Sequence, residues 1–205
     1  MKIIFATHNE GKVKEMRALL SDLKIDVFSA VEAGIVEEVE EDGVTLEENA
    51  FKKAKFVAVK AGEWAIADDS GLFIEALNGA PGIHSARWVG EIQKYDDLMT
   101  YTLDKLRNVP DGERKAYFQT ALALCASDGR SWIFCGRDDG EIANGPRGGN
   151  IRPQLPYDQI FIPKGYIQTF AEMTDEQKNK LSHRGRAFEQ FKKFVKEKGL
   201  GFFKN

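Results

Sequence analysis

Carboxylates are concentrated in two short stretches of this sequence. The stretch E-E-V-E-E-D contains Glu40 and Glu41, and A-I-A-D-D-S-G contains Asp68 and Asp69. If the segments that carry them are neighbours, three or four oxygen ligands converge, and Mg²⁺ is the cation expected in such a set. Without a cation, like charges this close would raise the pKa of one carboxyl group. Both arrangements could activate water, through a metal ion or a base; the alternative is a solvated acidic rim.

The order of residues in A-I-A-D-D-S-G bears on where each carboxylate points. Asp68 and Asp69 follow a short apolar run and precede Ser70 and Gly71. Neighbouring residues of a strand point to opposite faces, so a strand end could bury one carboxylate and expose the other. We therefore expect the strand to end here and the chain to turn.

The stretch T-H-N-E-G-K, residues 7–12, connects a strand-like run to a helix. Free backbone N–H groups and the positive end of the helix dipole would face outward there, and Lys12 adds a full charge. This combination suits a phosphate group. The alternative is an ordinary helix start capped by Asn9.

Three lysines follow one another closely in E-N-A-F-K-K-A-K, namely Lys52, Lys53 and Lys55. Helical spacing lets only one or two of them face the carboxylates. A lysine there would keep an acid ionised and neutralise phosphate; the alternative is a solvated amphipathic helix.

The turn S-H-R-G-R places His183 beside Arg184. Arginine only donates hydrogen bonds, and a neutral histidine can donate or accept, so the pair suits a carbonyl oxygen such as that of a 6-keto purine. Adenine would present a donor instead and leave buried groups unpaired.

Hydrophobic periodicity predicts a mixed α/β sheet with flanking helices. A capping box is expected at Thr45 and Glu48, and the stripe Phe188, Phe191 and Val195 is expected to pack in the core. The S-D-G-R turn predicts a hairpin. The expected strands are 2–7, 25–30, 72–77, 115–126, 131–137 and 158–163; the expected helices follow Asn9 and span about 45–61, 95–108 and the C-terminal stripe.

The overall composition is that of an ordinary globular protein, with 42% apolar and 30% charged residues and a net charge of −3. This charge argues against a broad surface for a nucleic-acid polymer or a membrane. We expect Cys125 and Cys135 to be buried free thiols on paired strands. There is no signal segment and no apolar stretch of about 20 residues, so a cytoplasmic location is expected.

Five motifs carry a resemblance to a known family. T-H-N-E-G-K, E-N-A-x-x-K-A, A-D-D-S-G, L-N-G-A-P-G-I-H-S-A-R and S-H-R-G-R-A occur in this order. Together they resemble the inosine triphosphate pyrophosphatase family, over about residues 3–195. The resemblance implies one elongated α/β domain, residues 1–205, with two lobes around a central cleft, normally a homodimer. It also implies Mg²⁺-dependent hydrolysis of ITP, dITP and XTP to the monophosphate and pyrophosphate, which cleanses the nucleotide pool.

The same resemblance implies roles for individual residues. Glu41 and Asp69 would hold the metal, with Glu40 and Asp68 as further candidates, and Asp69 would accept the proton of the attacking water. Asp68 would secure the turn or support the metal ligands. Lys53 would support the triphosphate and Ser70 would touch substrate. The remaining substrate-binding residues are Thr7, His8, Asn9, Glu10, Gly11 and Lys12 for the triphosphate, and Tyr157, Asp158, Lys178, His183 and Arg184 toward the base.

One segment departs from the family pattern. Residues 146–161 read P-R-G-G-N-I-R-P-Q-L-P-Y-D-Q-I-F, about three residues longer than usual, with Leu155 in place of a base-stacking aromatic and Pro156 in place of a glycine. Stacking contributes about 0.5–1.5 kcal/mol beyond area burial, so base affinity should weaken. Arg152 is a candidate to stack instead.

Three functional hypotheses follow. The first is hydrolysis of inosine and xanthosine triphosphates, the second is the same chemistry with a changed base preference, and the third is a nucleotide-binding sensor without turnover. Glu41, Lys53 and Asp69 argue against a sensor, because binding alone needs no base beside the metal. A phosphatase with an aspartyl nucleophile would have its acids directly after the first strand, where this chain has Thr7 and His8. A serine hydrolase would have a G-x-S-x-G motif, which this sequence lacks. The preference between ribose and deoxyribose, the dimer surface and the role of His84 stay open.

Overall fold

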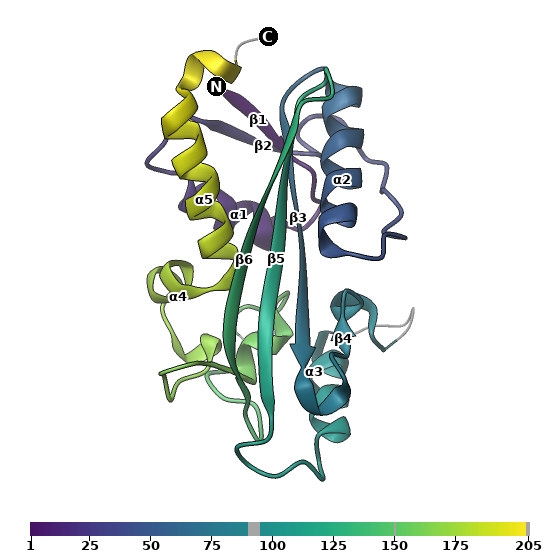
Figure 1. Ribbon diagram of the computed structural model, residues 1–205, viewed down its shortest axis with the longest axis vertical. Coiled ribbons are helices and arrows are strands. Elements are labelled where there is room, and N and C mark those ends of the chain that lie inside the picture. The colour runs from purple at the N-terminus through teal and green to yellow at the C-terminus, as the bar shows by residue number, and fades with distance from the viewer. Residues whose placement is uncertain (90–94, 150, 204–205) are drawn as a thin grey trace. The chain divides into compact units, whose positions relative to one another are not determined.

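The computed structural model describes residues 1–89, 95–149 and 151–203. Within these ranges, seven strands form one sheet in the order β2-β1-β3-β5-β6-β7, with β4 paired to β3 (Figure 1). The strands are β1 Lys2–Phe5, β2 Asp26–Ser29, β3 Ala65–Ile74, β4 Pro81–Gly82, β5 Lys115–Cys125, β6 Ser131–Ile142 and β7 Phe161–Pro163. The α-helices are α1 Glu10–Leu19, α2 Leu46–Ala61, α3 Tyr95–Lys105, α4 Asp175–Leu181 and α5 His183–Lys198.

The sheet is mixed, as the sequence predicts. Strand β1 pairs in parallel with β2 and with β3, whereas β4 is antiparallel to β3 and β7 is antiparallel to β6. The parallel pairs need long crossover connections, and helices α1 and α2 lie in those connections. The expected mixed α/β fold is confirmed.

The chain divides into two compact units. Unit 1 comprises Met1–Asp69, Thr120–Gly136 and Arg184–Asn205, and unit 2 comprises Ser70–Gln119 and Arg137–His183. The division falls within two of the five sequence motifs, between Asp69 and Ser70 in A-D-D-S-G and between His183 and Arg184 in S-H-R-G-R-A. Each unit is therefore considered with its own core.

The core of unit 1 is built by β-strand residues together with α1 and α5. Phe188, Phe191 and Val195 are all buried in it, so the predicted core stripe of the C-terminal helix is confirmed. Helix α1 contributes Val13 and Met16 to the same cluster. In Figure 1, α2 and α5 flank the strands of unit 1. Lys12 of α1, Lys53 of α2 and Arg184 of α5 belong to the candidate site described below.

Helices α1 and α2 of unit 1 start at the caps that the sequence predicts. The Asn9 side chain accepts a hydrogen bond from Lys12 N at 3.0 Å, and Thr45 Oγ1 accepts one from Glu48 N at 3.1 Å. The second half of the expected capping box differs, because the Glu48 carboxylate accepts from Val44 N at 2.8 Å. Each cap satisfies N–H groups that a helix start otherwise leaves without a partner.

The core of unit 2 lies between its strands, α3 and the segment around Tyr157. Leu72 and Ile74 of β3 pack there with Phe118 of β5 and Phe161 of β7. The N-G-A-P-G stretch forms the expected turn, with Asn78 at φ 52° and Gly79 at φ 86°. Strand β4 follows the turn directly and pairs with Leu72 and Phe73 of β3.

The expectation that the strand carrying Asp68 and Asp69 ends at A-D-D-S-G is wrong. Strand β3 continues unbroken to Ile74, so it contains both aspartates and also the apolar run that we expected to form a separate strand. Gly71 explains part of this continuity, because a Cβ there would lie 2.5 Å from Gly82 O and only glycine permits that approach. The cationic partners of the two aspartates, described below, supply the rest.

Three smaller expectations also need correction. Residues 156–159 form a 3₁₀ turn, so the strand expected at 158–163 begins only at Phe161. Helix α3 ends at Lys105, slightly before the expected end. Cys125 is buried but Cys135 is exposed, because the alternation of β6 turns Phe134 inward and Cys135 outward. Among the described residues, no helix has both the length and the apolar character needed to cross a membrane.

Candidate functional site

Asp68 is the centre of a buried cluster of charges in unit 1. Its Oδ1 accepts from Lys12 Nζ at 3.2 Å, and its Oδ2 accepts from Arg184 Nε and Nη2 at 3.1 and 3.0 Å. Arg184 also pairs with Glu15 of α1. The carboxylate thus joins α1 and the first turn of α5 to the middle of β3. It does not secure a turn, as the sequence had suggested, because no turn follows it.

The electrostatics of this cluster favour a permanently ionised Asp68. Burial alone would raise the pKa of Asp68, but Lys12 and Arg184 outweigh burial and hold it well below its usual range. Burial likewise would lower the pKa of Arg184, yet the carboxylates of Glu15 and Asp68 raise it. For Lys12, burial is the largest influence and lowers its pKa. The cluster therefore keeps the buried Asp68 carboxylate ionised between Lys12 and Arg184.

A second cluster in unit 1 contains Glu41, Lys53 and Asp69. Lys53 Nζ donates to Glu41 Oε1 at 2.5 Å and to Asp69 Oδ1 at 3.2 Å. The other oxygen of Asp69 accepts from Asn49 Nδ2 at 3.2 Å. Of the three lysines on α2, Lys53 thus faces the carboxylates, as helical spacing led us to expect.

Burial and charge oppose each other at this second cluster. Burial raises the pKa of Asp69 above its usual value; Lys53 opposes that rise and Glu41 adds to it. Burial would lower the pKa of Lys53, but Asp69 and Glu41 together outweigh it and raise that pKa. A positive charge between the two acids is what allows both of them to lie so close in a partly buried place.

The two carboxylates are a suitable but incomplete donor set for a divalent cation. Glu41 and Asp69 both contact the ammonium group of Lys53, so both carboxylates can reach one positively charged centre. Within residues 1–89, 95–149 and 151–203, no group of three or more His, Cys, Asp or Glu side chains could enclose a metal ion. This arrangement fits Mg²⁺, which typically uses one or two carboxylates and completes its shell with water and substrate phosphates. Glu40, the further candidate, is exposed.

Residues 7–12 form the expected transition from strand to helix. Thr7 Oγ1 accepts from Asn9 N at 3.2 Å, and Asn9 caps α1. His8 Nε2 lies 3.3 Å from Ile35 O, while Glu10 and Gly11 are exposed in the first turn. The capping interpretation is confirmed, and phosphate binding at this helix start stays a prediction.

Unit 2 holds four of the five residues predicted to meet the base, and the fifth, Arg184, belongs to unit 1. Lys178 Nζ donates to Asp158 Oδ2 at 2.7 Å, and both side chains are buried. Tyr157 Oη donates to Ser85 O at 2.9 Å, and burial raises its pKa. The His183 ring stacks on Phe118 with centroids 4.5 Å apart and an angle of 13°. Ser70 is half-buried and His84 is exposed.

The segment that departs from the family pattern is held by Arg152. Its guanidinium donates to Phe170 O and Met173 O, each at 3.0 Å, and to Asp175 at 2.7 Å. Leu155 is half-buried, and Pro156 opens the 3₁₀ turn, a position where its missing N–H costs nothing. Stacking of Arg152 on a base stays a prediction; Asn150, in the same segment, lies outside the described residues.

Two residues of these clusters were not found by sequence reasoning. Asn49 is completely buried in the first turn of α2, and a polar amide at a buried position of a predicted helix is itself a signal, because a buried polar group needs hydrogen-bond partners. Glu15 on α1 gives no such signal, since it reads as an ordinary surface acid. Its partner Arg184 lies 169 positions away.

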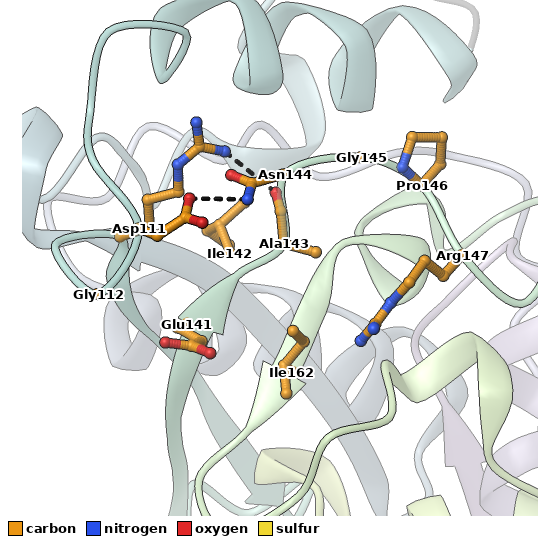
Figure 2. A pocket seen from close by; sticks show the side chains of 11 residues that line it. Asp111, Gly112, Glu141, Ile142, Ala143, Asn144, Gly145, Pro146, Arg147 and Ile162 are labelled. Atoms are coloured by element: carbon orange, nitrogen blue, oxygen red, sulfur yellow. Dashed lines mark hydrogen bonds between the residues drawn. The ribbon is translucent and has the colours of Figure 1, made fainter.

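Unit 2 also has a pocket of about 380 Å³, lined by Asp111, Gly112, Arg114, residues 141–147 and Ile162. Figure 2 shows Asn144 and Asp111 facing one another, with Asn144 Nδ2 donating to Asp111 Oδ1 at 2.7 Å. Arg114, which also lines the pocket, donates to backbone carbonyls of Leu106, Val109 and Ala143. None of the predicted site residues lines this pocket.

Comparison with known proteins matches nearly the whole chain. The model of the Ham1 family matches residues 3–194. A dITP/XTP pyrophosphatase of Thermoanaerobacter pseudethanolicus is 40% identical over 195 residues, which are 95% of this chain and 96% of that protein. The dITP/XTP pyrophosphatase of Bacillus subtilis is 42% identical over 192 residues, covering 94% and 96%. The structure of a HAM1 protein from Coxiella burnetii superposes with a TM-score of 0.85 at 38% identity, covering 96% of this chain and 99% of that one.

Proposed function

Because the chain belongs to the Ham1 family, we propose that it is a nucleoside triphosphate pyrophosphatase acting on non-standard purine nucleotides. ITP, dITP and XTP would be hydrolysed to the monophosphate and pyrophosphate. The observation that carries this proposal is the position of Lys53, whose ammonium group contacts both Glu41 and Asp69. Two acids and a lysine in this arrangement can manage a metal ion, a water molecule and an anionic phosphate chain.

Mg²⁺ is the proposed cofactor, held by Glu41 and Asp69, with Asp68 and Glu40 as further candidates. When bound, it would neutralise phosphate charge and lower the barrier to attack by water. Of the two further candidates, Asp68 already accepts hydrogen bonds from Lys12 and Arg184 on both of its oxygens. Its proposed contribution is to hold those two cations in place.

The side chains of unit 1 would act on the triphosphate. The start of α1, with residues from Thr7 to Lys12, would bind phosphate oxygens through backbone N–H groups and the Lys12 ammonium. Lys53 would neutralise charge beside Asp69. One oxygen of Asp69 would accept the proton of the attacking water, while its Oδ2 stays hydrogen-bonded to Asn49.

The side chains of unit 2 would recognise the base, and Arg184 of unit 1 is a further candidate for this role. Lys178 and His183 can donate to a purine carbonyl oxygen, and Asp158 can accept from a ring N–H. Tyr157 would position this set through its bond to Ser85 O, and Ser70 would contact substrate. We also propose that residues 1–205 act as one domain, in a homodimer located in the cytoplasm. The same chemistry with a changed base preference is the second candidate, favoured by Leu155 and Pro156.

A product assay over a panel of substrates tests the proposal. The protein is incubated with Mg²⁺ and ITP, dITP, XTP, GTP or ATP, and the products are separated. Pyrophosphate and monophosphate from ITP or XTP support the proposal, while release of orthophosphate overturns it. Nucleotide binding without any product would support the sensor hypothesis. Asp69→Asn should abolish turnover with an unchanged fold, and full activity in this variant would remove Asp69 from the mechanism.

A further inference from the structure

Glu41 lies on a segment with no regular secondary structure. Residues 37–43 belong to neither a helix nor a strand, so backbone pairing within an element does not fix the position of this carboxylate. Asp69 is held differently, in the middle of β3. A metal site made from one carboxylate on an irregular segment and one on a strand requires something that fixes the distance between them.

Asn49 connects these two pieces of chain. Its side-chain oxygen accepts from Gly43 N at 2.8 Å, and its amide nitrogen donates to Asp69 Oδ2 at 3.2 Å. The Asn49 side chain is completely buried, and Asp69 is 7% exposed. One planar amide group therefore joins the backbone two residues after Glu41 to the carboxylate of Asp69, through one partly buried and one buried hydrogen bond.

The asparagine amide supplies both the acceptor and the donor that these two bonds require. Gly43 N–H is a donor and requires an acceptor, whereas the Asp69 carboxylate is an acceptor and requires a donor. The two partners thus determine which way the amide group points. An aspartate could accept from Gly43 but would repel Asp69, and a leucine of similar size would leave both partners unsatisfied.

Gly43 is matched to this contact. A Cβ at residue 43 would lie 2.6 Å from Asn49 Oδ1 and 2.9 Å from Glu48 Cβ, closer than atoms approach in proteins. Glycine therefore lets the segment approach α2 closely enough for the hydrogen bond to form. The glycine at position 43 and the amide group of Asn49 are therefore both required for the hydrogen bond between them.

Asn49 and Lys53 differ in how they hold the acids. They are one helical turn apart on α2, so they face the same side. The lysine has a long flexible stem, and its ammonium occupies the place between the carboxylates that a cation would share. The short Asn49 side chain donates to Asp69 Oδ2, whereas Lys53 donates to Oδ1. The bond from Asn49 can therefore persist when Lys53 moves.

We propose that Asn49 is a positioning residue that sets the affinity for the divalent cation, by holding Asp69 and the Glu41 segment in register. The inference rests on the proposed function, because it concerns the two carboxylates assigned there to the metal. Residues that orient metal ligands typically change affinity roughly 10- to 100-fold when they are removed.

The test measures binding of Mn²⁺ alone, without nucleotide, by the resonance signal of the free ion. Asn49→Ala is expected to weaken Mn²⁺ binding roughly tenfold or more. It should also raise the Mg²⁺ concentration needed for half-maximal ITP hydrolysis, with a smaller effect on kcat at saturating Mg²⁺. Gly43→Ala should weaken Mn²⁺ binding in the same direction, and it serves alone if Asn49→Ala does not fold.

Thr45→Ala is the matched control. It removes the cap of the same helix without touching either carboxylate, so it should lower thermal stability while Mn²⁺ affinity stays unchanged. The double variant Gly43→Ala/Asn49→Ala should lose less affinity than the product of the two single losses, because both changes break one link. Wild-type affinity in Asn49→Ala, or independent losses in the double variant, would overturn the inference. If the wild-type protein neither binds Mn²⁺ nor hydrolyses ITP, the proposed function itself fails.

Discussion

Replacing Asp68 by Asn removes the negative charge that lies between two cations of unit 1. The Asp68 side chain is 0% exposed, Arg184 is 4% exposed and Lys12 is 22% exposed. Asparagine has nearly the same shape, so packing is preserved while the charge is lost. Its amide nitrogen would also face a cation where a carboxylate oxygen now accepts a hydrogen bond.

The expected loss follows from the number of cations left without a counter-charge. Removing one partner of a buried ion pair costs about 3–5 kcal/mol, because the remaining charge stays out of water. Arg184 keeps Glu15 as a second partner, so the lower end of this range applies. For a chain of this size each kcal/mol corresponds to about 2–4 °C in Tm, so Asp68→Asn should melt roughly 6–12 °C lower.

Calorimetric or circular-dichroism melts at pH 7.0 would measure this loss. Lys180→Gln is the control, since Lys180 and Glu176 form an exposed pair, 74% and 79% accessible, which should contribute little. Glu15→Gln should lower Tm by less than Asp68→Asn, because only Arg184 loses a partner. If Asp68→Asn melts no lower than Lys180→Gln, the reasoning about a buried charge cluster is refuted.

Three further predictions concern other contacts. Lys53→Met should lower kcat for ITP by roughly 100-fold, whereas Lys52→Met on the same helix should not; equal losses in steady-state assays would contradict the assignment. Arg152→Ala should raise KM for ITP more than it lowers kcat, with no rescue by Arg152→Lys, since the fork of donors is lost. The hydrogen bond from Arg17 and the backbone N–H of Ser29 lower the pKa of Glu32 to about 2 from 4.5. A lowered folded-state pKa stabilises the fold above pH 4.5, so the stability difference from Glu32→Gln should shrink as pH falls from 4.5 toward 2 in urea titrations; a constant difference would contradict it.

Local patterns in the sequence were sufficient for the helix starts and for the class of the sheet. The caps at Asn9 and Thr45, the buried stripe of α5 and the mixed sheet all follow from residues within one or two turns of each other, and all are confirmed. Helical spacing also singled out lysines of α2 as able to reach the acids. The family resemblance, which depends on the order of five motifs, is confirmed by the comparisons.

Long-range contacts were beyond these patterns. The sequence suggested that the chain would leave the strand at Asp68 and Asp69, because the apolar run ends there and Ser70 and Gly71 follow. The strand continues because Arg184, 116 positions away, and Lys12, 56 positions away, neutralise Asp68. Lys53 neutralises Asp69 from α2, and Asn49 of the same helix donates a hydrogen bond to it. No local pattern shows that such partners exist.

The sequence by itself therefore determined the types of element, the family and the residues able to do chemistry, since these depend on neighbouring side chains and on motif order. Only the tertiary structure decided which acid is neutralised by which cation, that Cys135 faces outward, and that Asn49 ties Gly43 to Asp69. The physical reason is that the cost of a buried charge or polar group depends on partners brought near by folding, whatever their separation along the chain.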